Sequence, residues 1–326
     1  MMKEMQEFIT RKVGYEKKSE FTVANYRRWL TELCNILDIS TIEEFLALGV
    51  DDLERYVETL QLHDNQTSSI WTKCIAIQSF YTYLIKKGFC SHNLMKDIFS
   101  DLPKKEQKEF LPPTREQIEL ILSAVKDKTY YTLFHFLAQT GARIGETLNI
   151  KVDAFVTDPK EGNSVKLFGK GKKQRTVFLS DEAMEVITSY IENYRKEPKI
   201  LTAAEFKQTK SVKNFASYES YLKAMKKSEG LLFLSRTGKQ LNQSNIYKSF
   251  QRYSKKVGID TDKYKCSCHK IRTSFATNGM NRWGISLPEM QDILGHSKST
   301  TTLKYYKPSQ EQKRQSFSKV PNIVNC

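Results

Sequence analysis

Residues 164–179, SVKLFGKGKKQRTVFL, predict a β-hairpin. Ser164–Phe168 and Arg175–Leu179 are short β-prone runs, and the glycines and lysines between them are typical of a tight, basic turn. On both sides of this hairpin, apolar residues recur at steps of three and four, which is the period of an α-helix. The sequence therefore predicts a mainly α-helical protein with one small antiparallel β-sheet.

The part of the chain after residue 114 predicts a second, α-rich domain. Thr114-Arg-Glu-Gln117 has the form of a capping box, the pairing of side chains that opens a helix. Residues 195–229 are rich in lysine and weakly patterned, so an inserted loop or a marginal helix is expected there, before a strand-like run at Leu232–Ser235. Further helices are expected at 130–139, 181–194, 242–257, 269–282 and 287–294, with another starting near Arg143.

The first hundred residues predict a compact bundle of four helices. Residues 22–37 present one apolar face, and Thr41-Ile-Glu-Glu44 is a second capping box. Another helix starts near Asp51, and a long one ends near Gly88. Residues 101–113 are polar, charged and flanked by prolines, which is typical of a linker. A chain of 326 residues is also longer than one hydrophobic core usually serves, so two domains are expected.

The distribution of charge predicts an anionic partner. The net charge is +15, with −2 on residues 1–110 and +17 on residues 111–326, while residues 31–70 alone carry −8. Nucleic acid is the commonest partner of so basic a protein, with the acidic face turned away from it. No apolar run approaches the ~18 residues that span a bilayer, and the polar start is no signal peptide, so we expect a cytoplasmic protein without membrane contact.

The six cysteines predict no disulfide framework, because they are scattered through a long chain without a secretory signal. Cys266-Ser-Cys268-His269 places three soft ligands close together. A structural zinc usually needs a second ligand pair, and the sequence has none at the required spacing. We therefore expect two buried thiols here and no bound metal.

Four segments of the second domain carry basic or nucleophilic residues. They are Thr140–Glu146 (TGARIGE), Gly169–Arg175 (GKGKKQR), His269–Arg272 (HKIR), and Leu294-Gly-His296 followed by Tyr305. In this order and at these separations they resemble the catalytic domain of the tyrosine recombinases, the phage-integrase type. The resemblance covers most of residues 114–306. It implies a helical core-binding domain that contacts DNA in residues 1–100, a linker at 101–113, and a catalytic domain with a C-terminal tail in 114–326.

Cleavage of a DNA phosphodiester without a metal requires a nucleophile, cations for the non-bridging oxygens, and an acid for the leaving oxygen. Arginine binds phosphate through two parallel hydrogen bonds, so Arg143 and Arg272 are the candidates for a phosphate clamp. Glu146, one turn after Arg143, is placed to orient it. By resemblance, Lys170 is the general acid for the departing 5′-oxygen, with Lys172 and Lys173 as alternatives.

The histidines and the nucleophile follow from spacing and from the resemblance. His269 and Arg272 are three residues apart, so they project from one helical face. The resemblance implies that His269 accepts or shuttles the tyrosine proton and that His296 hydrogen-bonds the scissile phosphate. Tyr305, nine residues after His296, is the implied nucleophile, and Tyr306 is the alternative. His135, in apolar LFHFLA, is expected in the core.

The pattern departs from that of many relatives at two positions and leaves the sites of DNA contact open. Thr273 stands where many relatives have a second histidine, and Cys268 stands where proline is frequent. Neither change removes a proposed catalytic group. Candidates for DNA contact are Arg27, Arg28, Lys73 and the residues from Lys239 to Lys248.

The resemblance implies a cofactor-free, site-specific DNA recombinase that closes as a clamp on double-stranded DNA with a recombination site. It also implies a 3′-phosphotyrosyl intermediate and a homo-tetramer on synapsed DNA. The role that it implies is integration and excision of a mobile element or Xer-like dimer resolution, and the sequence leaves both open. A type IB topoisomerase, a telomere resolvase and a non-catalytic DNA-binding regulator remain alternatives. The tail after Tyr306, which has a basic stretch followed by the apolar Val320, Ile323 and Val324, is expected to dock on a neighbouring subunit.

Overall fold

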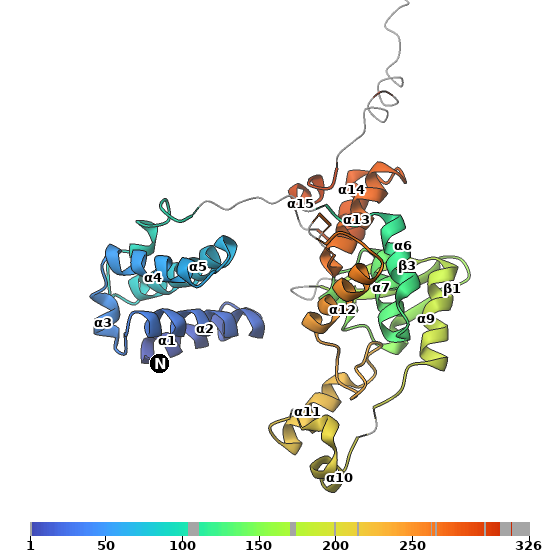
Figure 1. Ribbon diagram of the computed structural model, residues 1–326, viewed down its shortest axis with the longest axis horizontal. Helices are drawn as coiled ribbons and strands as arrows, with labels where there is room; N and C mark the ends of the chain where they lie inside the picture. Colours follow the sequence, from blue (N-terminus) through green and yellow to red (C-terminus); the bar gives the residue numbers. More distant parts are fainter. Residues whose placement is uncertain are drawn as a thin grey trace, which may run out of the picture. The chain divides into compact units, whose positions relative to one another are not determined.

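The structure is a computed structural model, shown in Figure 1. It describes residues 2–103, 111–169, 174–198, 200–213, 215–261, 263–264, 266–296, 298–306 and 314. The chain divides into two compact units, Met1–Lys108 and Glu109–Cys326, and each is described by itself. The mainly α-helical architecture with one small antiparallel sheet is the one that the sequence predicted.

The first unit is a helical bundle that contains one α-helix more than the sequence predicted. The additional helix, α1, presents Met5, Phe8 and Ile9 to the interior. Thr41 and Glu44 form the expected capping box. The elements are α1 (Lys3–Gly14), α2 (Glu20–Ile36), α3 (Ile42–Leu46), α4 (Val50–Leu62), α5 (Thr67–Lys86) and the 3-10 helix η1 (Leu94–Lys96).

Helix α5 forms the centre of this bundle. Its Phe80 is fully buried, with ring centroids 5.2 Å from Phe8 of α1 and 5.1 Å from Phe45 of α3. These aromatic contacts bind α1 to the bundle, although its sequence is polar on average. The spacing of Met5, Phe8 and Ile9 at three and four residues is the signal that reveals this helix.

The prediction that Lys73 contacts DNA is wrong. Its side chain is buried, and its ammonium lies 2.8 Å from Glu32 Oε1 and 3.0 Å from Asn65 Oδ1. A buried ammonium stays charged only when it is paired and hydrogen-bonded, so this lysine is committed to the interior of the bundle. Arg27 and Arg28 of α2 are exposed.

The second unit combines helices with a three-stranded antiparallel sheet in the order β1-β2-β3. The predicted hairpin is present as β2 and β3, in a register that pairs Val165 with Val177. Strand β1 was not predicted. The elements are α6 (Arg115–Ala124), α7 (Lys128–Thr140), α8 (Ile144–Thr147), η2 (Val152–Ala154), β1 (Phe155–Asp158), β2 (Gly162–Phe168), β3 (Gln174–Leu179), α9 (Asp181–Asn193), α10 (Ala203–Gln208), η4 (Lys210–Val212), α11 (Tyr218–Ser228), α12 (Gln243–Lys256), α13 (Cys268–Asn281), α14 (Leu287–Leu294) and α15 (Ser299–Leu303).

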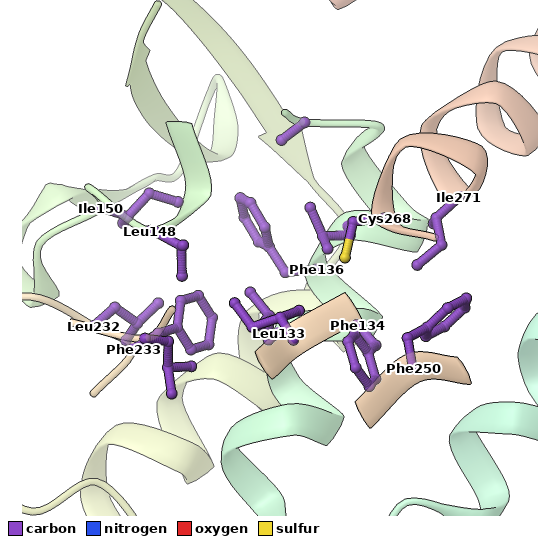
Figure 2. Packing of buried hydrophobic residues seen from close by; sticks show 14 of the residues in the cluster. Leu133, Phe134, Phe136, Leu148, Ile150, Leu232, Phe233, Phe250, Cys268 and Ile271 are labelled. Carbon is purple, nitrogen blue, oxygen red and sulfur yellow. The ribbon is translucent and has the colours of Figure 1, made fainter. Parts of the chain in front are cut away.

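Helix α7 runs through the core of the second unit and packs against α9, α13 and β3. Figure 2 shows its Leu133, Phe134 and Phe136 among side chains from several other elements. The rings of Phe134 and Phe250 meet edge to face with centroids 4.9 Å apart. His135 is buried as predicted, and burial lowers the pKa of its imidazole.

The segment around residues 195–229 is better ordered than its sequence pattern suggested. It contains α10, η4 and α11, which Figure 1 shows projecting from one end of the second unit. A separate apolar cluster of Val212, Tyr221 and Met225 holds these elements together. The expected strand at Leu232–Ser235 is reduced to isolated bridges, in which Leu231 pairs with Lys151 and Leu234 with Gln240.

We predict that Phe134→Ala destabilises the protein by about 3–5 kcal/mol, because it removes a fully buried ring and leaves a cavity against Phe250. Phe178 of β3 is 67% exposed, so Phe178→Ala is the matched control and is expected to change stability by less than about 0.5 kcal/mol. Urea unfolding of the two variants measures the difference. An equal loss of stability in the two variants would contradict the assignment of α7 to the core.

Candidate active site

Arg272 is the most deeply buried cation of the second unit among the described residues, with 1% of its surface exposed. Its Nη1 donates to the carbonyl oxygen of Gly141 at 2.7 Å, and its Nη2 donates to that of Leu294 at 2.6 Å. These carbonyls belong to the C-terminal ends of α7 and α14, which leave acceptors unpaired and carry partial negative charge. The guanidinium therefore satisfies two helix ends at once and fixes their separation.

The burial of Arg272 has an electrostatic consequence. Desolvation, together with the charges of Arg143 and Arg175, lowers the pKa of its guanidinium to about 9. The group is still charged at neutral pH, and it is held in a cluster of like charges. Such a cluster favours the binding of an anion, which would offset the repulsion.

Glu146 lies between two arginines. One carboxylate oxygen accepts from Arg143 Nη1 at 2.9 Å, and the other accepts from Arg175 Nη2 at 2.6 Å. Burial alone would raise the pKa of this carboxyl, but the hydrogen bonds and charges of Arg175 and Arg143 outweigh burial and lower the pKa. The contact with Arg143 is the one expected from their spacing.

Arg175 has a positioning role that the sequence analysis did not assign. Besides binding Glu146, its Nε donates to the carbonyl oxygen of Ile293 at 3.1 Å, so it connects β3 to the end of α14. In β3, Arg175 lies on the same face as the buried Val177 and Leu179. That period of two is the sequence signal that places Arg175 toward the interior.

His296 is held in one tautomer. Its Nε2 lies 2.9 Å from Arg272 Nη2, and its Nδ1 lies 2.8 Å from Oγ1 of the buried Thr302. A guanidinium can only donate hydrogen bonds, so Nε2 of His296 is the acceptor. The ring proton is therefore on Nδ1, which donates to Thr302. Burial and the neighbouring arginines lower the pKa of His296 to about 4, which keeps the ring neutral.

The two candidate nucleophiles differ in their surroundings. Tyr305 is half-buried, packs against the apolar cluster that contains Leu294, and has its ring centroid 6.2 Å from that of His296. The side chain of Tyr306 is 48% exposed. This difference favours Tyr305 as the residue that belongs to the site.

A cavity of about 520 Å³ brings three of the predicted residues together. Arg143, His269 and Arg272 line it, together with Glu146 and with Phe168 and Gly169 at the end of β2. Partial burial and the charges of Arg272, Lys270 and Arg143 lower the pKa of His269, so its ring is neutral at pH 7 and able to accept a proton. Lys170 follows Gly169 in the chain and lies outside the described residues, as do Lys172 and Lys173.

The two cysteines beside His269 are part of the core. Cys266 and Cys268 are buried, and burial raises the pKa of the Cys268 thiol to about 12. Within the residues that the structure describes, no group of His, Cys, Asp and Glu is arranged to hold a metal ion. None of the helices formed by those residues combines the length and the apolar character needed to cross a membrane.

We predict that Glu146→Gln destabilises the protein by about 3 kcal/mol at pH 7, because it leaves Arg175 without its buried partner. The lowered pKa of Glu146 means that its contribution is complete above the pKa of the unfolded chain and is lost as the pH falls through the folded value. The difference in the free energy of unfolding between wild type and variant should therefore become smaller at acid pH. Urea unfolding between about pH 3 and pH 7 measures it.

Glu119→Gln is the control for this prediction, since Glu119 pairs with Arg115 in an exposed setting. It should change stability by less than about 0.5 kcal/mol at any of these pH values. If Glu146→Gln lowered the free energy of unfolding by the same amount at pH 7 and at acid pH, the charge of Glu146 would not be what stabilises the site.

Comparison with known proteins identifies the family. The model of the phage integrase family matches residues 113–313, and that of the family's N-terminal SAM-like domain matches residues 10–88. Tyrosine recombinase XerC of Halalkalibacterium halodurans is 28% identical over 294 residues, covering 88% of this chain and 86% of that protein. Tyrosine recombinase XerD of Staphylococcus epidermidis is 27% identical over 307 residues, covering 92% of each.

A solved structure shows the same fold. The crystal structure of a lambda integrase (75–356) dimer bound to a COC′ core site superimposes with a TM-score of 0.67 at 14% identity, covering 94% of this chain and 95% of that one. The two family models match residues in both units. The chain is therefore a tyrosine recombinase that belongs to the phage integrase family.

Proposed function

We propose that this recombinase cuts and rejoins double-stranded DNA at a specific recombination site, with Tyr305 as the nucleophile. Tyr305 attacks the scissile phosphorus, a 3′-phosphotyrosyl bond forms, and the bond to the 5′-oxygen breaks. The 5′-hydroxyl of a partner strand then attacks the phosphotyrosine and releases the tyrosine. The observation that carries the proposal is the cavity lined by Arg143, His269 and Arg272, with the ring of Tyr305 6.2 Å from that of His296, which is hydrogen-bonded to Arg272.

The charge of the site suits this reaction. Three arginines surround one carboxylate, and both nearby histidines are neutral, so the cluster has an excess of two positive charges. A phosphodiester brings one negative charge, and a second develops as the nucleophile adds. The cluster therefore offsets the charge of the transition state better than that of the ground state, which is what lowers a barrier.

The proton transfers are assigned to His269 and Lys170. His269 is neutral at pH 7 and lines the cavity, so it is suited to accept the proton of the tyrosine hydroxyl. The role of Lys170 as the acid for the 5′-oxygen rests on the family resemblance. It is supported by the position of Gly169, the preceding residue, at the edge of the same cavity.

His296 changes its hydrogen bonding in this scheme. In the structure its Nε2 accepts from Arg272, whereas a bond to the phosphate requires Nε2 to donate. The hydroxyl of Thr302 can either accept from Nδ1 or donate to it, so it supports both tautomers of His296. We therefore assign Thr302 the role of holding the ring while a phosphate replaces Arg272 at Nε2.

The proposed partners are DNA and further copies of the chain. We propose assembly as a homo-tetramer on synapsed DNA in the cytoplasm, serving either integration and excision of a mobile element or Xer-like dimer resolution. No cofactor is needed, because the energy of the cleaved bond is kept in the phosphotyrosine. Residues 311–326, proposed to dock on a neighbouring subunit, lie outside the described residues apart from Arg314.

We predict that a nicked duplex, which traps the covalent intermediate, forms a protein–DNA adduct with wild type and with Tyr306→Phe but not with Tyr305→Phe. Phenylalanine keeps the ring packing and removes only the attacking oxygen. Selection from random DNA supplies the site, and a denaturing gel measures the adduct. Tyr306→Phe is the matched control.

Other results would point elsewhere. An adduct lost only in Tyr306→Phe would assign the nucleophile to the neighbouring residue. Tight binding without any adduct would favour a non-catalytic DNA-binding regulator. Relaxation of supercoils by a monomer would indicate topoisomerase IB-like activity, and hairpin products would indicate a telomere resolvase.

A further inference from the structure

A second and larger cavity lies between the inserted segment and the body of the second unit. This groove, of about 1510 Å³, is lined on one side by residues of the segment 200–229 and on the other by the start of α7, the end of α9, the turn 234–241 and α12. Figure 1 shows α10 and α11 at one end of the unit. The insert contributes Leu201, Thr209, Val212 and Tyr221 to the lining.

The groove carries a large excess of positive charge. Among the described residues, seven cationic side chains and two carboxylates line it. Both carboxylates are engaged: Asp127 accepts from the backbone N–H groups of Thr129 and Tyr130, and Glu197 pairs with Arg195. Five of these cations are exposed and form no ion pair with any carboxylate of the described residues: Lys126, Lys128, Lys196, Arg236 and Arg252.

The walls of the groove are held in place by packing. The hydroxyl of the buried Ser228 in α11 accepts from the backbone N–H of Gln240 at 2.9 Å, and the ammonium of Lys239 lies 3.3 Å from the ring centroid of Phe215. Gly238 has a φ of +77°, and a Cβ there would lie 2.2 Å from Pro198 Cβ. The turn 234–241 is therefore fixed between the segment 194–198 and the insert.

Helix α12 connects the groove to the active site. Its first residue, Gln243, lines the catalytic cavity, whereas Asn245, Ser249 and Arg252 of the same helix line the groove. Nine residues of α-helix span about 14 Å, which is roughly the length of four base pairs. A duplex that places a phosphate at Arg272 and follows α12 therefore reaches Arg252 within about half a helical turn of DNA.

We propose that this groove binds the phosphate backbone of the double-stranded DNA that flanks the cleavage point. The inference rests on the proposed function and adds a second binding surface to it. The exposed lysine and arginine side chains lie on the wall that the body of the unit forms, and they match phosphates in charge and in hydrogen bonding. Such contacts are independent of base sequence. The groove thereby lengthens the stretch of DNA that one subunit holds.

The test compares two DNA lengths and two pairs of substitutions. Arg236→Ala combined with Arg252→Ala removes two exposed cations from the groove. Lys160→Ala combined with Lys263→Ala removes the same charge from exposed positions that line neither cavity, and it is the matched control. The short DNA carries only the selected site, and the long DNA extends it by about 15 base pairs on each side with either of two unrelated sequences.

We predict that the groove variant weakens binding to long DNA and leaves binding to short DNA unchanged. The slope of log affinity against log salt should fall by about 1.8 on long DNA, or about 0.9 for each lost phosphate contact, with either flanking sequence. Filter binding or fluorescence anisotropy in a series of KCl concentrations measures it. Adduct formation on a short nicked substrate should equal that of wild type.

Three results would overturn the inference: equal weakening on both DNA lengths, no change on long DNA, or the same change in the control variant. Failure of wild type to form an adduct would contradict the proposed function and leave the length comparison valid. A variant that binds DNA normally but no longer assembles into higher oligomers would assign the groove to a contact between subunits instead.

Discussion

The buried guanidinium of Arg272 is the contact on which the arrangement of the second unit depends. It binds the carbonyl oxygens at the ends of α7 and α14, and it also donates to His296. Both helices end at a glycine with positive φ, Gly141 and Gly295, and these turns expose the carbonyls to the arginine. At Gly141 the space is also closed, since a Cβ would lie 2.5 Å from Phe275 Cδ1. One side chain of α13 therefore sets the positions of the segments that carry Arg143 and His296.

This arrangement stabilises the fold through hydrogen bonds, and it also brings like charges close together. Glu146 neutralises one of three neighbouring arginines, and the remaining charge lowers the pKa of Arg272 and of His296. Where cations repel one another in this way, the binding of a phosphate anion lowers the electrostatic free energy of the cluster. Further negative charge that develops in a transition state lowers it again. Arg175 belongs to the same charge cluster, because it shares Glu146 with Arg143. It also connects β3 to α14. The hairpin that contains β3 is thus connected directly to the arginine cluster.

Much of the fold and the site could be predicted from local sequence signals. The hairpin, the capping boxes at Thr41 and Thr114, and the single helical face shared by His269 and Arg272 depend on contacts between near neighbours in the chain. What could not be predicted depends on distant contacts. Lys73 has the pattern of a surface lysine until Glu32, forty-one residues away, is placed beside it. Thr302 gains its role only when His296 is next to it, and α1 is retained through Phe8 packing on Phe80.

The inserted segment shows why a weak sequence pattern does not imply a loose structure. An insertion on the surface of a folded domain cannot bury its apolar residues in the existing core, so it must form a core of its own or stay unfolded. Here the solution is a cluster of aromatic rings from α10, α11 and the bend that precedes α11, with the centroids of Phe215 and Tyr221 5.2 Å apart. The insertion therefore adds a small core of its own, and its Leu201, Thr209, Val212 and Tyr221 complete the lining of a groove whose cations belong to the body of the unit.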